Sequence, residues 1–207
     1  MARWIGLGVL GVVVLLVLVV GGCAVRVNNQ LVGLEQNVNE KWAQVQNVYQ
    51  RRADLIPNLV ETVKGFAAQE RTVLTEVVEA RAKATSIQVT PETLNDPKAM
   101  ERFQAAQGQL SGALSRLLVT VERYPELKAN ANFRDLQAQL EGTENRITVE
   151  RQKFNSAAQQ YNTAVKQFPT SILAGMFHFQ PRPYFQAAPG AETPPKVQFD
   201  FGKPTNK

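Results

Sequence analysis

The first two dozen residues form an uninterrupted apolar run. The chain carries no charged residue from Trp4 to Val25, and Arg3 and Arg26 flank this stretch. A helix over these residues would reach about 33 Å, which is enough to cross a hydrocarbon core of about 30 Å. The pattern therefore predicts an N-terminal membrane anchor over residues 1–27, either a transmembrane helix or a lipoprotein signal.

Beyond residue 28, apolar residues recur every three or four positions, which indicates helices. The clearest row repeats every seven residues and predicts one face of a helix packed against its neighbours in a left-handed bundle: Phe133, Leu140, Ile147, Phe154, Tyr161 and Phe168. Shorter rows of the same kind run through residues 38–77 and 100–124. We interpret these side chains as bundle core rather than as ligand contacts.

Pro57 is the ambiguous position in this helical region. A proline lacks the N–H and clashes with the preceding turn, so the helix should kink or stop near Ile56. The seven-residue repeat continues through Pro57, which favours a kinked continuous helix. Stopping there instead gives four segments of about thirty residues each, the pattern of an up-and-down bundle: 28–55, 57–86, 92–124 and 133–167.

We favour the structural break at Pro57. One unbroken first helix would reach roughly 88 Å, and its membrane-proximal face would lack an obvious cover. The predicted fold is all-α, an up-and-down antiparallel four-helix bundle with long helices over residues 28–180, preceded by the anchor. The last long helix then runs back towards the membrane. The apolar segment 172–179 is expected to cap the bundle or to lie on the bilayer, and we favour the cap.

The anchor ends near Cys23, the one cysteine of the chain. The sequence Val20-Gly21-Gly22-Cys23 resembles a lipobox, in which case residues 1–22 would be removed and acyl chains on Cys23 would hold the protein. An uncleaved transmembrane helix is the other interpretation, and an ordinary cleaved signal peptide fits least. The flanking charges favour a cytoplasmic N-terminus and an extracytoplasmic, periplasmic helical domain.

Composition and motifs give little sign of chemistry. The net charge of +5 is modest, and no basic run alternates with aromatic residues, so nucleic acid is not an expected partner. His178 is the one histidine, which argues against a His/Cys metal site. No phosphate loop, cofactor fingerprint or nucleophile with a base is found. We expect no catalysis, no cofactor, no metal and no small-molecule substrate.

Several motifs resemble those of the LemA family. They cover almost the whole chain after the anchor: Gln50 to Phe66 (QRRADLIPNLVETVKGF), Ala80-Arg81-Ala82, Gln107 to Leu110, Gly142 to Ile147, Tyr161-Asn162 and Pro181 to Phe185. Two positions depart from the family pattern. Val27-Asn28-Asn29 stands where Tyr-Asn is usual, and His178 stands where a glycine is usual.

The resemblance implies an N-terminal membrane segment followed by an up-and-down helical bundle, and it implies no known reaction. A relative in magnetotactic bacteria is associated with building magnetosome membranes. The family has also been described with its N-terminus outside, which is opposite to the orientation that the charges favour.

Polar residues of these motifs form a candidate interaction surface: Arg51, Arg52, Asp54, Asn58, Lys64, Glu70, Glu144 and Arg146. Arg52 falls in the apolar register and needs a carboxylate or carbonyl partner if it is buried. The cluster could brace the break at Pro57 through an ion pair or a cap. It could also dock another protein.

Residues 181–207 are rich in proline and alanine and read as an extended or disordered tail. The alternation of Val197, Phe199 and Phe201 could add a strand to a partner's sheet. The whole pattern predicts a membrane-anchored helical scaffold without catalysis, whose partners are the lipid bilayer and another protein or further copies of itself. The alternative is a membrane-remodelling or membrane-organising protein that acts by oligomerisation, and an enzyme is a distant third.

Overall fold

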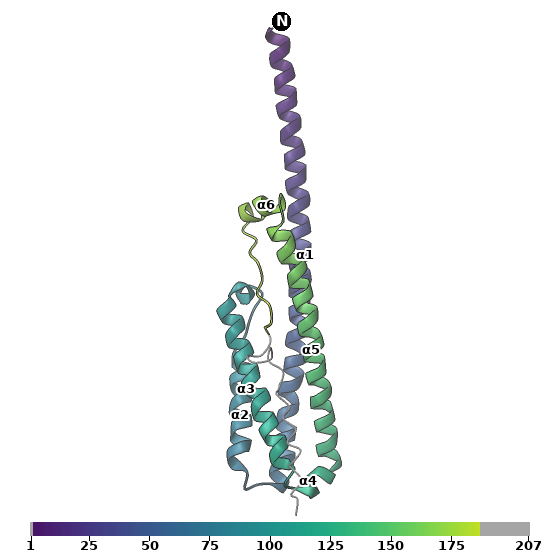
Figure 1. Cartoon of the computed structure of the whole chain (residues 1–207), viewed down its shortest axis with the longest axis vertical. Helices are drawn as coiled ribbons and strands as arrows, with labels where there is room; N and C mark the ends of the chain where they lie inside the picture. The colour runs from purple at the N-terminus through teal and green to yellow at the C-terminus, as the bar shows by residue number, and fades with distance from the viewer. Residues whose placement is uncertain (1, 187–207) are drawn as a thin grey trace, which may run out of the picture.

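A computed structural model describes residues 2–186, with side chains from residue 10 onward. This part of the chain is all-α, and its helices follow in the order α1 (Ala2–Phe66), α2 (Arg71–Ser86), the 3-10 turn η1 (Thr93–Asn95), α3 (Pro97–Val121), α4 (Pro125–Ala129), α5 (Ala131–Lys166) and α6 (Thr170–Met176). The long helices lie antiparallel, with α5 along α1 and α3 along α2 (Figure 1). The predicted all-α fold of long antiparallel helices is confirmed.

Helix α1 contains 65 residues and is therefore about 98 Å long. Its N-terminal part projects alone beyond the rest of the molecule (Figure 1). It is the one helix in the described residues that is long and apolar enough to cross a membrane. The side chains from Val12 to Val20 are at least half exposed, as expected of a surface that meets lipid. This helix suggests membrane anchoring.

The helix continues through Pro57, so the favoured division of the chain at Pro57 is wrong. A proline at this position leaves the carbonyl of Ala53, four residues earlier, without its helical donor. The guanidinium of Arg81 in α2 supplies one instead, because its Nε donates to the Ala53 oxygen at 2.7 Å. A tertiary contact thus replaces the hydrogen bond that Pro57 removes from the helix.

The chain reverses instead at residues 67–70. Glu70 is braced across this turn, because its carboxylate accepts from the Tyr124 hydroxyl at 2.9 Å and from Arg123 at 3.0 Å. Gln69 also donates to the Tyr124 hydroxyl. The reversal is therefore braced by the turn between α3 and α4, which a local sequence pattern does not reveal.

The membrane-proximal half of α1 is covered after all. Trp42 and Gln46 each donate to the Val89 carbonyl, which ties the α2–α3 loop to α1. Phe185 stacks on Trp42 from the C-terminal segment at a ring distance of 6.0 Å. The loop, α5, α6 and this segment supply the cover whose absence counted against a long first helix.

The buried apolar residues form two clusters along the bundle. The proximal core contains Leu31 to Tyr49 of α1 with the C-terminal half of α5, and the distal core contains Ile56 to Ala67 with α2 and α4. Five members of the predicted α5 row are buried in them. The sixth, Phe168, is wrong as a core residue, because α5 ends at Lys166 and the Phe168 side chain is 77% exposed.

Candidate functional site

Arg52 lies between the two cores and is only 2% exposed. Its Nη1 donates to the Glu144 carboxylate of α5 at 2.9 Å and to the Ser111 hydroxyl of α3 at 2.9 Å. Its Nη2 donates to the side-chain oxygen of Gln107, whose own amide donates to the Ala84 carbonyl of α2. One guanidinium therefore connects all four long helices.

The positive charge of Arg52 serves a structural purpose in this network. A buried guanidinium needs partners for its donors, and removing one partner of such a group is strongly destabilising. Glu144 is 54% exposed, so it holds one end of the pair at the surface. Arg52 and Glu144 are therefore committed to the bundle and are not free to bind a partner molecule.

The remaining predicted residues do not gather at one place. Glu70 braces the turn at the end of the bundle away from the anchor, as described above. Arg51, Asp54 and Asn58 are exposed on the side of α1 that faces away from the core, and Asp54 accepts only from Gln50 one turn earlier. Lys64 and Arg146 are also exposed, and Lys64 pairs within α1 with Glu61.

Arg182 is a buried polar residue that the sequence analysis missed, because it lies in the segment expected to be an extended or disordered tail. Its side chain is 4% exposed and donates to the Glu35 carboxylate at 2.6 Å and to the Pro91 carbonyl at 3.2 Å. It thus joins the C-terminal segment to α1 and to the α2–α3 loop. The Pro-Arg-Pro motif was the available signal.

Two asparagines of α5 hold this C-terminal segment by its backbone. Asn162 donates to the Arg182 carbonyl at 2.8 Å and accepts from the Arg182 N–H at 2.7 Å. Asn155 makes the same pair of bonds with Phe185, at 3.0 Å and 2.8 Å.

The spacing of these asparagines matches an extended chain. Seven helical residues rise about 10.5 Å, and three extended residues span about 10 Å. Residues 181–186 are therefore held as a strap along α5. Residues 187–207, including the predicted strand pattern at Val197 to Phe201, lie outside the described residues.

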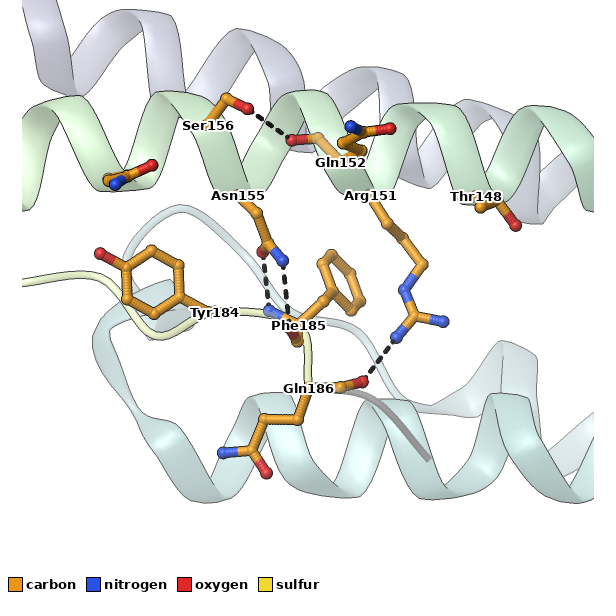
Figure 2. Close-up of a pocket in the computed structure, with 9 residues that line it drawn as sticks. Thr148, Arg151, Gln152, Asn155, Ser156, Tyr184, Phe185 and Gln186 are labelled. Carbon is orange, nitrogen blue, oxygen red and sulfur yellow. Dashed lines mark hydrogen bonds between the residues drawn. The ribbon is translucent and has the colours of Figure 1, made fainter. Parts of the chain in front are cut away.

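An open groove lies where the strap meets α5 (Figure 2). Arg151 donates to the Gln186 carbonyl there and also lies over the Phe185 ring at 4.6 Å. The other lining side chains are amides, hydroxyls and aromatic rings: Thr148, Gln152, Asn155, Ser156, Gln159, Tyr184, Phe185 and Gln186. This lining contains no carboxylate or histidine to exchange a proton.

Among the described residues, the buried Tyr161 hydroxyl has the most strongly shifted pKa. Burial, with a smaller contribution from Glu35, raises the pKa of Tyr161 to about 12, against the opposing charge of Arg182. The hydroxyl is therefore protonated throughout the physiological range. Among residues 2–186, no three His, Cys, Asp or Glu side chains lie close enough to hold a metal ion.

Comparison with known proteins gives a family and several relatives. Residues 41–199 match the model of the LemA family. The chain is 28% identical over 183 residues to magnetosome protein MamQ 2 of Paramagnetospirillum magneticum. This match covers 80% of this chain and 67% of that protein. The chain is 26% identical over 182 residues to magnetosome protein MamQ of Magnetospirillum gryphiswaldense, with the same two shares covered. The matched region contains every residue of the candidate surface.

Proposed function

This chain belongs to the LemA family, and we propose that it is a membrane-anchored helical scaffold that binds another protein and carries out no reaction of its own. The outer face of α1 is the proposed docking surface. It is defined here by Arg51, Asp54 and Asn58, and we call it the outer α1 face.

The observation that carries this proposal is that the longest motif has one buried side and one exposed side. Arg52 and Ile56 face the core and hold the helices together, whereas Arg51, Asp54 and Asn58 are exposed. In the described residues, the side chains of these three make no hydrogen bond or salt bridge to another helix. A cation, an anion and an amide that the bundle does not use remain available for polar recognition.

We assign no reaction to the groove beside the strap. Proton transfer requires a group whose pKa lies near the working pH. The lining contains no carboxylate, histidine or cysteine, the side chains that most often transfer protons in enzymes. The groove therefore resembles a packing seam between a helix and an extended segment.

The proposed anchor is an uncleaved transmembrane helix, with lipidation at Cys23 as the alternative. The helix α1 runs without a break from the apolar stretch through Gly21, Gly22 and Cys23 into the bundle. We propose that the helical domain lies on the extracytoplasmic side, as the flanking charges favour. The intact mass of the membrane-extracted protein separates the two forms, because lipidation requires loss of residues 1–22 and a gain of acyl mass.

The docking proposal is tested by in-cell crosslinking of the tagged full chain, followed by quantitative mass spectrometry of the captured proteins. The Arg51→Ala/Asp54→Ala/Asn58→Ala variant should lose at least one crosslinked partner by about tenfold, since truncating polar contacts at an interface centre costs about 1–2 kcal/mol or more. The control is Arg134→Ala/Asp135→Ala, which removes one cation and one anion from an exposed part of α5. Identical partner sets in all three proteins would reject the outer α1 face as a docking surface.

A second candidate is a membrane-organising protein that acts by self-association. It is favoured by the similarity over 80% of this chain to proteins named for the magnetosome. Purified full chain reconstituted in liposomes should then cluster or deform them in proportion to its surface density. Unchanged liposomes at high density, with the protein monomeric by crosslinking, would reject this candidate.

A further inference from the structure

We propose that α6 and its flanks form a second lipid-contacting surface, which rests in the headgroup layer of the bilayer that holds α1. The surface consists of Phe168, Ile172, Met176 and Phe177, and we call it the α6 apolar surface. This inference depends on the proposed membrane anchoring of α1 and adds a second point of contact to it.

The α6 apolar surface is large for so short a helix. Phe168 is 77% exposed, Ile172 58%, Met176 66% and Phe177 42%. Phe168, Ile172 and Met176 follow at intervals of four, so the two within α6 lie on one side of it. Single exposed apolar residues are ordinary, but a contiguous group of them marks an interaction surface.

The position of α6 along α1 identifies lipid as the occupant. Helix α6 contacts α1; its Ala174 belongs to the same buried cluster as Leu31, and Val27 and Leu34 pack against that cluster. These α1 residues begin about 3 Å beyond Val25, the end of the exposed apolar run, and Leu31 lies about 9 Å beyond it. The headgroup layer on each side of a bilayer is about 5–7 Å deep.

A helix is about 10 Å across, so α6 at this level reaches from the bundle into the headgroup layer. Figure 1 shows α6 beside α1, at the end of the bundle from which the apolar part of α1 projects. Arg26 directly follows Val25, Lys166 ends α5 just before α6, and both side chains are exposed. Cationic side chains near the membrane surface favour anionic headgroups. Amphipathic helices with apolar residues on one side and cations nearby bind at this depth.

The surface is already formed and needs no rearrangement. Ala174 is 1% exposed and fixes the inner side of α6 in the proximal core. The C-terminal end is closed by two backbone bonds, from Phe179 N–H to the Ala174 oxygen at 2.9 Å and from His178 N–H to the Gly175 oxygen at 3.3 Å. The exposed side chains are therefore presented on a fixed platform.

Both forms of the anchor place α6 at the same level of the bilayer. A transmembrane helix places the edge of the hydrocarbon near Val25, and acyl chains on Cys23 would place it within one helical turn of the same point. In either case α6 meets the same layer of the bilayer. A second copy of the chain that covered this surface would have to displace the lipid that surrounds the adjacent part of α1.

The test is photocrosslinking of the full chain in vesicles of phosphatidylcholine with phosphatidylglycerol. A photoreactive benzophenone residue replaces Met176 in one protein. In two controls it replaces Val25, which is retained with either anchor, or Val119, an apolar side chain that is 71% exposed on α3. Lipid adducts at Met176 should approach the yield at Val25 and exceed the yield at Val119 by at least about tenfold.

The outcomes separate the two proposals. Lipid adducts at Val25 but not at Met176 would overturn the inference about α6 and leave the anchor intact. An absence of adducts at Val25 would overturn the membrane anchoring itself, and the inference would fail with it. Protein dimers in place of lipid adducts at Met176 would also overturn the inference, in favour of self-association. Circular dichroism of each labelled protein establishes that the bundle is folded.

Discussion

The carbonyl of Ala53 explains how a proline is accommodated inside the longest helix. Pro57 removes the N–H that would normally bind this oxygen, and the Arg81 guanidinium takes its place at 2.7 Å. The proline thus creates a binding point for α2 on α1. Two motifs that are separated in the sequence, around Pro57 and around Arg81, act here as one interaction.

This pairing predicts that the effect of removing Arg81 depends on Pro57. In the wild-type chain, Arg81→Ala leaves a partly buried carbonyl without a donor and should lower the free energy of unfolding by about 1–3 kcal/mol. In a Pro57→Ala background, the restored N–H can bind the Ala53 oxygen, so the same change should cost clearly less. Urea unfolding of the full chain in detergent, followed by circular dichroism, measures all four proteins.

The single Pro57→Ala variant is the control for helix propensity, because alanine is the better helix former and raises stability by itself. The double-mutant cycle removes that contribution and isolates the coupling between the two positions. Equal losses from Arg81→Ala in both backgrounds would show that Arg81 does not serve the carbonyl that Pro57 leaves free.

Helices were predicted well where apolar residues recur at a regular spacing. The row from Phe133 to Tyr161 on α5 is buried as expected, because one face of a long helix must meet its neighbours. The start of α3 also has a local signal in the sequence, since Asp96 accepts from the Lys98 N–H just before Pro97 begins the helix. In these places the local pattern and the tertiary structure agree.

The turn at residues 67–70 and the strap could not be found in this way. The turn has no proline or glycine of its own and depends on Tyr124 and Arg123 for its contacts with Glu70. The strap depends on side chains of α5 that lie 20 and 30 residues earlier in the chain. Among the site residues, the pattern placed Arg52 in the apolar register. Its partners Gln107, Ser111 and Glu144 could be identified only from the folded structure.

The end of α6 has the geometry of a helix closed by a left-handed residue. His178 has a φ of 61°, and the two bonds that follow α6 are those of the Schellman motif, in which glycine is the usual residue at this position. A side chain other than glycine is strained there by about 1–2 kcal/mol. This position is the one where the motif resemblance expects a glycine.

We therefore expect His178→Gly to stabilise the protein by about 1 kcal/mol. Thermal unfolding of the full chain in detergent should show a higher midpoint for the variant. His178→Ala is the matched control, because it removes the imidazole and keeps the Cβ. A similar gain from both substitutions would indicate that the imidazole, and not the backbone conformation, is unfavourable.

The molecule consists of a proximal core and a distal core with the Arg52 network between them. The proximal core depends on the C-terminal strap, because Phe185 packs against Trp42 and Phe154 and Arg182 bonds Glu35. The distal core is built from α2, α4 and the adjoining parts of α1, α3 and α5, and the strap does not enter it. The two halves should therefore differ in their dependence on the strap.

Removing the two asparagines that hold the strap tests this difference. Asn155→Ala/Asn162→Ala removes four hydrogen bonds worth about 0.5–1.5 kcal/mol each, so amide exchange in residues 31–49 should accelerate by at least about tenfold through local opening. Residues 56–66 of the same helix should keep their protection, because their partners are in the distal core. Hydrogen exchange with mass spectrometry resolves the two stretches of α1 within one experiment.

The matched control is Gln139→Ala/Asn145→Ala, which removes two exposed amides from α5. Acceleration over the whole of α1 in the test variant would mean that the two cores open as one unit, and the Arg52 network would then couple them rather than separate them. Acceleration confined to residues 31–49 would also bear on the membrane end of the molecule. The α6 apolar surface is fixed by the same core, so loss of the strap would loosen the platform that presents it to the bilayer.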